Sequence, residues 1–106
     1  MSYRVRFAPE AEEQLTKLYR YISQATSPNT ALSYTEGVVD YCESLEQFPH
    51  RGNQRDDILS GLRITNYRSK TVVAFMVEET KQIVTILGIW HGGQDYESHL
   101  HSEGTN

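Results

Sequence analysis

The sequence predicts an α+β fold: an N-terminal strand, then an antiparallel helical hairpin packed on one face of a four-stranded, mainly antiparallel sheet. Three observations predict it, because the chain opens on an alternating strand, continues with two amphipathic helices and then adds three strands. Helices in succession followed by strands in succession are typical of α+β layer folds. The length of 106 residues fits one domain, which we expect over 1–96, before a polar and flexible tail over 97–106.

The first predicted strand lies at the start of the chain, where apolar and basic residues alternate. This spacing turns Tyr3, Val5 and Phe7 toward a core and leaves Arg4 and Arg6 outside. Outward arginines are placed to meet an acidic partner. Arg4 and Arg6 are therefore candidate binding residues.

Two helical segments follow, and each has recognisable ends. Pro9 suits the first position of a helix, Ser27 is placed to cap a second one, and Pro49 would stop it. The apolar stripes recur at helical spacing, with Ala11, Leu15, Leu18, Tyr19 and Ile22 in the first helix and Ala31, Tyr34, Val38, Tyr41 or Cys42, Leu45 and Phe48 in the second. Gly37 interrupts the second helix at a cost of about 1 kcal/mol, which indicates either a close approach of the two helices or a tolerated site.

The segment 50–57 is polar and aperiodic, which predicts a surface loop before the second strand. That strand is expected over 62–67, where apolar and polar residues alternate again. The alternation groups its residues by face, Leu62 and Ile64 on one side and Arg63, Thr65 and Tyr67 on the other. We expect Arg63 to share the sheet face away from the helices with Arg4 and Arg6.

A strand hairpin forms the centre of the predicted sheet. Residues 71–77 and 82–90 are apolar and rich in β-branched side chains, and four polar residues join them. A strand that is apolar on both faces is normally central in its sheet. The second strand runs into the segment 91–95, which holds the most suggestive chemistry of the chain.

The net charge of −4 argues against a protein that coats nucleic acid through its overall electrostatic field. The charges are unevenly placed, because residues 49–76 hold five cations and two acids, a local net charge of 5 − 2 = +3. Such a segment is either a solvated loop and sheet edge or a binding surface.

Several classes of protein and site are disfavoured. The single cysteine, Cys42, rules out an internal disulfide. No cationic apolar leader opens the chain and no apolar run approaches the ~20 residues of a membrane span, so we expect a soluble, cytoplasmic protein that makes no membrane contact. The four histidines, His50, His91, His99 and His101, form no metal motif, and the sequence has no phosphate-binding loop or Ser-His-Asp arrangement. We expect neither a metal nor a cofactor.

Four short motifs occur in a characteristic order: 8–12 after the first strand, 48–52 in the loop, 61–63 at a strand start, and Trp-His-Gly-Gly-Gln-Asp at 90–95. With this set, the chain resembles the ParE branch of the RelE/ParE toxin superfamily from about Tyr3 to Tyr96. The resemblance implies the toxin half of a bacterial type II toxin–antitoxin pair, also described as a plasmid stabilisation system. It also implies a cognate antitoxin protein as partner.

The superfamily that the chain resembles has two activities. RelE-like members cut messenger RNA in the ribosome without a metal, by driving a ribose 2′-hydroxyl onto the neighbouring phosphate. That reaction needs a base, cations for the developing charge and an acid for the leaving oxygen. ParE-like members instead inhibit DNA gyrase by binding it, and they lack the full catalytic set.

Candidate catalytic residues are few. His91 has a pKa suited to a base or an acid, and Arg63 is suited to bind a phosphate. Possible helpers are Tyr67, Arg68, Lys70 and Tyr96. Gly88 stands where related toxins often carry an arginine. Strict alternation puts His91 on one face with Leu87 and Ile89, so it reaches a catalytic face only if a bulge or the following glycines turn it.

Each candidate also has a structural interpretation. His91 would then be a strand-end histidine that is hydrogen-bonded to the next turn, and Arg63 would pair with a neighbouring acid or bind an acidic partner. Trp90 would be a core residue or an interface anchor. We therefore predict a gyrase-binding toxin without catalysis, in which Arg63, Arg4, Arg6 and Trp90 are the binding residues.

Two alternatives stay open. One is a ribosome-dependent ribonuclease that uses His91, Arg63, Tyr96 and Lys70. The other is a degenerate member that only binds its antitoxin. A dimer or a toxin–antitoxin hetero-oligomer is compatible with each of the three.

Overall fold

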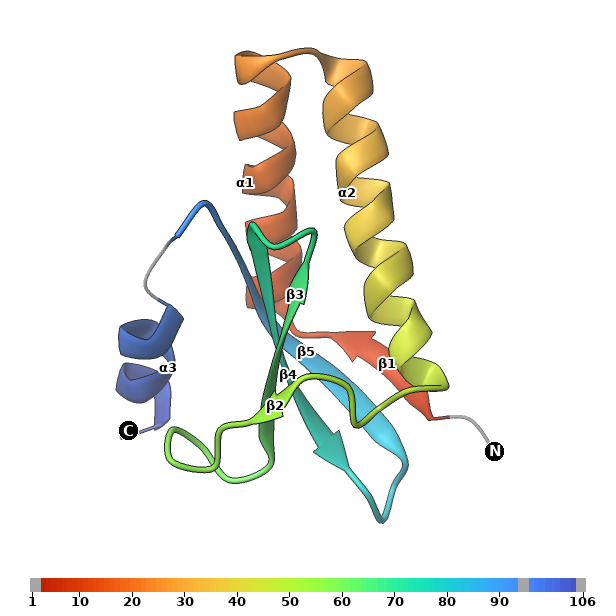
Figure 1. The fold of residues 1–106 in the computed structure, drawn as a ribbon, viewed down its shortest axis with the longest axis vertical. Helices are drawn as coiled ribbons and strands as arrows, with labels where there is room; N and C mark the ends of the chain where they lie inside the picture. Colours follow the sequence, from red (N-terminus) through yellow and green to blue (C-terminus); the bar gives the residue numbers. More distant parts are fainter. Residues whose placement is uncertain (1–2, 94–95, 105–106) are drawn as a thin grey trace.

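The structure, a computed structural model, describes residues 3–93 and 96–104. Its strands are β1 (Arg4–Phe7), β2 (Asn53–Gln54), β3 (Leu62–Tyr67), β4 (Thr71–Glu78) and β5 (Ile83–His91). Its helices are α1 (Pro9–Ala25), α2 (Pro28–Glu43), the short 3-10 helix η1 (Ser44–Glu46) and α3 (Tyr96–Gly104). In Figure 1, α1 and α2 stand side by side as a hairpin, and α3 lies on the opposite side of the sheet. The predicted α+β class and helical hairpin are confirmed.

The sheet has the strand order β1-β5-β4-β3-β2, so β4 is its centre, as the apolar sequence of this strand predicted. The pairs β2–β3, β3–β4 and β4–β5 are antiparallel, and β1 pairs parallel to β5. The predicted count of four strands is wrong, because β2 lies inside the segment 50–57 that was expected to be a loop. A strand of two residues is too short to show a period in the sequence.

The helix starts follow the predicted signals. Pro9 opens α1, and the Ser27 hydroxyl accepts a hydrogen bond of 3.1 Å from the backbone N–H of Thr30 at the start of α2. The end of α2 was predicted too late, because the helix ends at Glu43 and changes to η1. Phe48, which was assigned to the apolar stripe, is 56% exposed as a result.

Gly37 in α2 marks a close approach of a strand. A Cβ at this position would lie 2.1 Å from the hydroxyl oxygen of Tyr67 on β3. The close approach at Gly37 is therefore between α2 and the sheet, and the predicted approach of the two helices is wrong; an added side chain would have to displace the Tyr67 ring. The glycine lets α2 settle onto the tyrosine.

A β-bulge in β5 decides which residues face the helices. Phe75 pairs with Ile86 and Ala74 pairs with Gly88, so Leu87 has no partner in the ladder. The extra residue shifts the alternation, so Ile86 and Ile89 lie on the same face of the sheet. His91 follows Ile89 at the period of two and also lies on the helical side. Strict alternation along β5 breaks at Leu87. The bulge, one of the two ways predicted from the sequence for His91 to change face, therefore places His91 on the face of the sheet that the helical hairpin covers.

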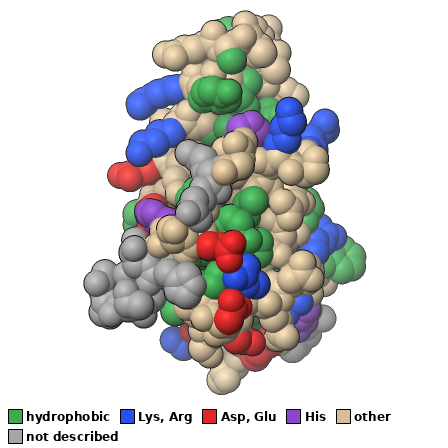
Figure 2. Space-filling model, turned by 60° about the vertical axis from the view of Figure 1, so that its left-hand side comes forward, with side chains coloured by type: hydrophobic (Ala, Val, Ile, Leu, Met, Phe, Trp, Pro, Cys, Tyr) green, Lys and Arg blue, Asp and Glu red, His purple; other side chains and the backbone are tan. Residues whose placement is uncertain are grey.

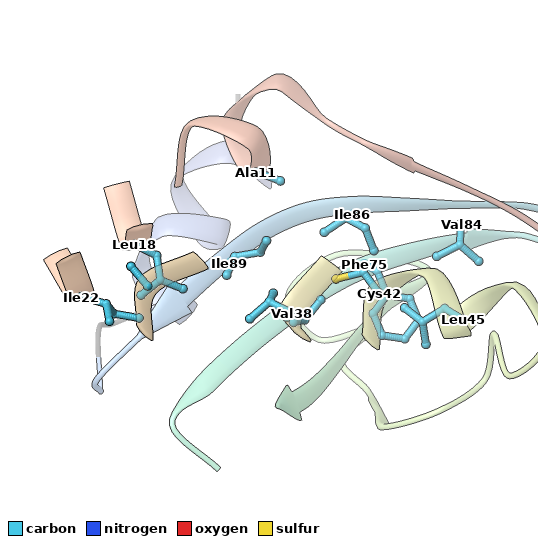
Figure 3. Close-up of a cluster of buried hydrophobic side chains, with 12 residues drawn as sticks. Ala11, Leu18, Ile22, Val38, Cys42, Leu45, Phe75, Val84, Ile86 and Ile89 are labelled. Atoms are coloured by element: carbon cyan, nitrogen blue, oxygen red, sulfur yellow. The ribbon is translucent and has the colours of Figure 1, made fainter. Parts of the chain in front are cut away.

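Each face of the sheet packs its own core. The hairpin-face cluster comprises Ala11, Leu18, Ile22, Ala31, Val38, Cys42, Leu45, Val73, Phe75, Val84, Ile86 and Ile89. Figure 3 shows these side chains meeting between the helices and the strands. The α3-face cluster comprises Ile58, Leu62, Ile64, Ala74, Trp90 and Leu100. The sheet is thus buried on both sides.

The three arginines expected on one face are divided between both faces. Arg63 lies opposite Phe75 in the β3–β4 ladder, and Phe75 belongs to the hairpin-face cluster. Directly opposite residues share a face, so Arg63 is on the helical side. Arg4 and Arg6 alternate with residues that pack on the hairpin-face cluster, so they lie on the other side.

Helix α3 occupies most of the segment that was predicted to be a polar tail. Leu100, the large apolar residue of this segment, is only 4% exposed because it packs in the α3-face cluster. The flexibility of 97–106 stays a prediction. Within the described residues, no helix has the length and apolar character needed to cross a membrane.

Candidate functional site

His91 ends β5 and is held by a chain of hydroxyl groups. The Thr71 side-chain oxygen lies 2.8 Å from His91 Nδ1 and 2.6 Å from the Tyr34 hydroxyl oxygen. Thr71 is fully buried and directly opposite His91 in the β4–β5 ladder. These two hydrogen bonds join α2, β4 and β5, and they fix the orientation of the imidazole.

Tyrosine rings surround the imidazole. The Tyr34 ring meets His91 edge-on at a centroid distance of 5.6 Å, and the Tyr67 ring meets Tyr34 in the same way at 5.4 Å. The Tyr21 ring of α1 lies 6.2 Å from His91 on another side. Tyr21, Tyr34 and Tyr67 thus form an aromatic cluster around His91, between the end of β5 and the helical hairpin.

The surroundings of His91 favour its neutral form. Burial lowers the pKa of His91 below its ordinary value of 6.5, and the positive charge of Lys70 lowers it further. The imidazole is therefore neutral at pH 7, a state in which one ring nitrogen accepts a proton. Chemically, this arrangement suits a base or a hydrogen-bonding partner better than an acid.

The β3–β4 turn brings basic side chains to the same end. Arg68 and Ser69 have φ angles of 52° and 61°, in the left-handed region that costs roughly 1–2 kcal/mol for a residue other than glycine. The Lys70 carbonyl accepts a 3.0 Å hydrogen bond from the backbone N–H of Gly92, which ties the turn to the end of β5. Lys70 is thereby held close to His91.

Arg63, a predicted phosphate ligand, has a local role away from His91. Its guanidinium donates to the backbone carbonyls of His50, Arg51 and Gly52, so it holds the loop before β2. Tyr67, at the His91 end of the same strand, is four residues further along, which is about 13 Å of extended chain. Arg63 and His91 therefore do not meet at one phosphate.

Tyr96 and Trp90 lie on the other face of the sheet. Trp90 is 6% exposed in the α3-face cluster, and the Tyr96 ring is 6.1 Å from it. The indole lies over Gly88, where a Cβ would be 2.2 Å from the ring. Trp90 is thus a core residue, and its ring fills the space that a side chain at position 88 would need.

Arg4 and Arg6 lie at the other end of the sheet on the edge strand β1. Arg4 is exposed and pairs through its backbone with Ile83, eight residues before His91 on β5. The Arg6 guanidinium donates to the Thr85 hydroxyl at 3.0 Å and lies 3.8 Å from the Glu78 carboxylate. These arginines form a surface separate from the surroundings of His91.

Of the four residues proposed for catalysis, the structure brings together His91 and Lys70. The sequence of the chain matches the model of the ParE toxin of the type II toxin–antitoxin system, parDE, over residues 5–96. The chain belongs to the ParE toxin family. This confirms the family that the four sequence motifs indicated.

Three solved structures share the fold of this ParE toxin. A chain of the chromosomal ParDE system from P. aeruginosa is 20% identical at a TM-score of 0.73, with 86% of this chain and 97% of that chain covered. A chain of the RelBE2 complex from Mycobacterium tuberculosis is 23% identical at a TM-score of 0.60, with coverages of 86% and 99%. A mutant of E. coli RelE in the free state is 17% identical at a TM-score of 0.66, with coverages of 99% and 96%. None of the curated proteins gives a significant sequence match.

Sequence reasoning missed three residues around His91 in this ParE toxin. Tyr34 was assigned to an apolar stripe and Thr71 to a strand, and neither assignment indicated their hydrogen bond. Tyr21 did leave a signal, because it stands outside the apolar stripe of α1 and is 63% exposed. A large aromatic residue off the stripe of a helix indicates a surface function or a contact with another element.

Two hollows flank the His91 end of the ParE toxin. One, of about 460 Å³, lies between α1 and β5 and is lined by Gln14, Lys17, Leu18, Tyr21, Ile89, Trp90, His91 and Gly92. The other, of about 390 Å³, lies beside the β3–β4 turn and is lined by Asn29, Thr30, Ser33, Tyr34, Tyr67 and Arg68. Over the part of the chain that the structure describes, there is no group of three histidine, cysteine or acidic side chains that could hold a metal.

Proposed function

We propose that this ParE-type toxin acts in the cytoplasm, inhibits DNA gyrase by binding it, and is neutralised by a cognate antitoxin. Membership of the ParE family supports the gyrase target, and the solved ParDE and RelBE2 structures support an antitoxin partner by similarity. One observation carries the choice of binding over cleavage: three of the residues proposed for catalysis lie apart. His91 lies at the end of β5 against Thr71, Arg63 binds the loop before β2, and Tyr96 packs on Trp90.

Cleavage of RNA by 2′-hydroxyl attack needs its base, cation and acid around one phosphate. Arg63 is committed to backbone carbonyls of the loop, and Tyr96 packs against Trp90 on the far face. The space over Gly88 is filled by the indole of Trp90. His91 and Lys70 alone provide a base and one cation, so the arrangement favours a binding protein.

The antitoxin would bury apolar surface of the helical hairpin. A hollow of about 560 Å³ runs between α1 and α2, with Leu15, Tyr19 and Val39 among its lining residues. Leu32 on α2 and Phe48 just after η1 are also exposed, at 50% and 56%. An amphipathic segment of the antitoxin could lay its apolar side along this hollow.

An acidic part of the antitoxin would reach Arg4 and Arg6 on the edge strand β1. Arg63 no longer belongs to this surface, because it lies on the other face and its guanidinium is occupied. The double charge reversal Arg4→Glu, Arg6→Glu should weaken antitoxin binding, measured by calorimetry. An unchanged affinity would remove β1 from the antitoxin surface.

Induced expression tests the choice of target. Binding to gyrase predicts relaxed plasmid DNA and a DNA-damage response while messenger RNA stays intact, and His91→Ala should remain toxic. Plasmid topology is measured on chloroquine gels and transcript integrity by primer extension. Transcripts cut at ribosomal positions, together with normal plasmid topology, would contradict the proposal.

The second candidate is a ribosome-dependent ribonuclease, which is favoured by the neutral imidazole of His91 next to Lys70. It predicts that His91→Ala abolishes toxicity while the protein stays folded. A third candidate, a toxin that has lost its activity and only binds its antitoxin, predicts no growth arrest at all when the antitoxin is absent.

A further inference from the structure

Most of the cationic side chains in the basic segment 49–76 make contacts within the protein. The Arg51 guanidinium lies over the rings of Tyr41 and Phe48. Arg55 pairs with Asp57 and Glu97 through hydrogen bonds of 2.9 and 2.7 Å. Arg63 binds backbone carbonyls.

Two cations of this segment, Arg68 and Lys70, are exposed on the turn beside His91. Arg68 keeps contact with the ring and the hydroxyl of Tyr67, and Lys70 lowers the pKa of His91 by its charge. A third cation, Lys17, comes from α1 and lines the same hollow as His91. Three cations among the described residues thus lie near His91, in a protein whose total charge is −4.

Acidic side chains are missing from the lining of both flanking hollows, as far as the described residues go. Figure 2, which looks at the molecule from the α3 side, shows basic side chains on both sides of the upper part, while acidic side chains gather mainly in the lower half with basic ones among them. A cationic end of this kind attracts anionic groups through its field.

An exposed aromatic ring accompanies the cations. Tyr21 follows Lys17 by one helical turn, so both side chains lie on one face of α1 and line the hollow beside His91. Its ring is 63% exposed. Cations that follow a phosphate backbone, together with a ring on which a base can stack, are the chemistry of single-stranded nucleic-acid binding.

We propose that the His91 end of the sheet binds single-stranded nucleic acid, with phosphates on Lys17, Arg68 and Lys70 and a base stacked on Tyr21. An acidic peptide would satisfy the cations but would not stack on the exposed part of the Tyr21 ring. A duplex would likewise not present a base face to this ring. The inference does not depend on gyrase being the target, because it concerns a surface of the toxin alone.

Fluorescence anisotropy with the purified chain tests the proposal, with labelled 12-nucleotide DNA, the same sequence as RNA, and a DNA duplex as probes. We expect the single strands to bind more tightly than the duplex. The relative affinities of DNA and RNA then tell which of the two the surface prefers. Three phosphate contacts predict that the logarithm of the affinity falls with the logarithm of the salt concentration with a slope of about −2.

Matched variants separate a local site from a general charge effect. Lys70→Glu should weaken single-strand binding at least fivefold, whereas Lys81→Glu, with the same change in net charge at the turn between β4 and β5, should change it less than twofold. Tyr21→Leu should weaken binding about fivefold, and Tyr21→Phe should restore it. Circular dichroism checks that each variant is folded.

Three outcomes would overturn the proposal. These are no binding by the wild-type chain, equal losses in the two charge-reversed variants, or duplex binding as tight as single-strand binding. Full displacement of the labelled strand by poly-glutamate at an equal charge concentration would instead assign the surface to an acidic peptide, and would overturn it as well.

Discussion

The two faces of the sheet are covered in different ways. The hairpin face is covered by α1 and α2, of 17 and 16 residues, whereas the other face is covered by the nine residues of α3. The first cover comes directly after β1 in the sequence, and the second comes last. The sheet therefore has one face closed by two long helices and one face whose burial depends on a short helix.

The difference also separates two uses of the end of β5. On the hairpin face, His91 joins a hydroxyl chain and stands beside basic residues. On the α3 face, Trp90 closes over Gly88 and is buried. Adjacent residues thus serve a surface on one side and a core on the other, and the bulge at Leu87 sets which residue does which.

The largest effect is expected from Phe75→Ala on the hairpin face. Phe75 is fully buried in the central strand β4, and its removal leaves a cavity that the two long helices of the hairpin cannot move to close. We expect the free energy of unfolding to fall by about 3–5 kcal/mol. Urea denaturation measures it, and a loss below about 1 kcal/mol would show that this face is not the main core.

Leu100→Ala should have a smaller effect on the α3 face, about 2 kcal/mol, because a helix of nine residues can move more easily than the long hairpin to relieve the cavity. The chain has one tryptophan, Trp90, which lies in the same cluster. Its fluorescence should shift to the red in the folded Leu100→Ala variant but stay unchanged in folded Phe75→Ala. Equal shifts in both variants would remove the distinction between the faces.

The sequence predicted the hairpin face well for a physical reason. Long helices repeat their apolar stripe over several turns, and Pro9 and Ser27 mark their starts, so pattern and end signals agree. The central position of β4 followed from its apolar residues on both faces. Such signals come from many residues together and are therefore hard to miss.

The α3 face and the site were predicted less well. Leu100 is a single apolar residue in a polar segment, which gives no period, and β2 has only two residues. Leu87 shifts the alternation of β5, and the neighbouring Gly88, a glycine inside a strand, is a signal for a bulge that does not say which residue is left unpaired. The contact of Tyr34 with Thr71 depends on how α2 lies on the sheet, which sequence spacing does not fix.

Gly37→Ala tests the fit of the hairpin on the sheet. In an ordinary helix this change would stabilise by about 1 kcal/mol, but here the new methyl would meet the hydroxyl of Tyr67. We expect a net loss of roughly 1 to 2 kcal/mol of unfolding free energy. Adding Tyr67→Phe should recover part of the loss, and a stabilising Gly37→Ala would show that α2 does not rest on this tyrosine.

The smallest expected effect is a pH dependence from His91. Burial and Lys70 lower its pKa in the folded protein below the ordinary 6.5, so the unfolded chain takes up the proton first as the pH falls. Stability should therefore decrease as the pH drops below about 6.5 toward the folded pKa. Urea midpoints at pH 7.5 and 5.5 should differ less in His91→Gln than in the wild type. Identical differences would show that the folded state leaves the pKa of His91 unchanged.

The supercoiling activity of purified gyrase tests the central claim most directly, because the reaction contains no ribosome and no messenger RNA. Added toxin should stop the introduction of supercoils in proportion to its concentration, and His91→Ala should inhibit as well as the wild type. Full gyrase activity at an excess of folded toxin would contradict the proposed function.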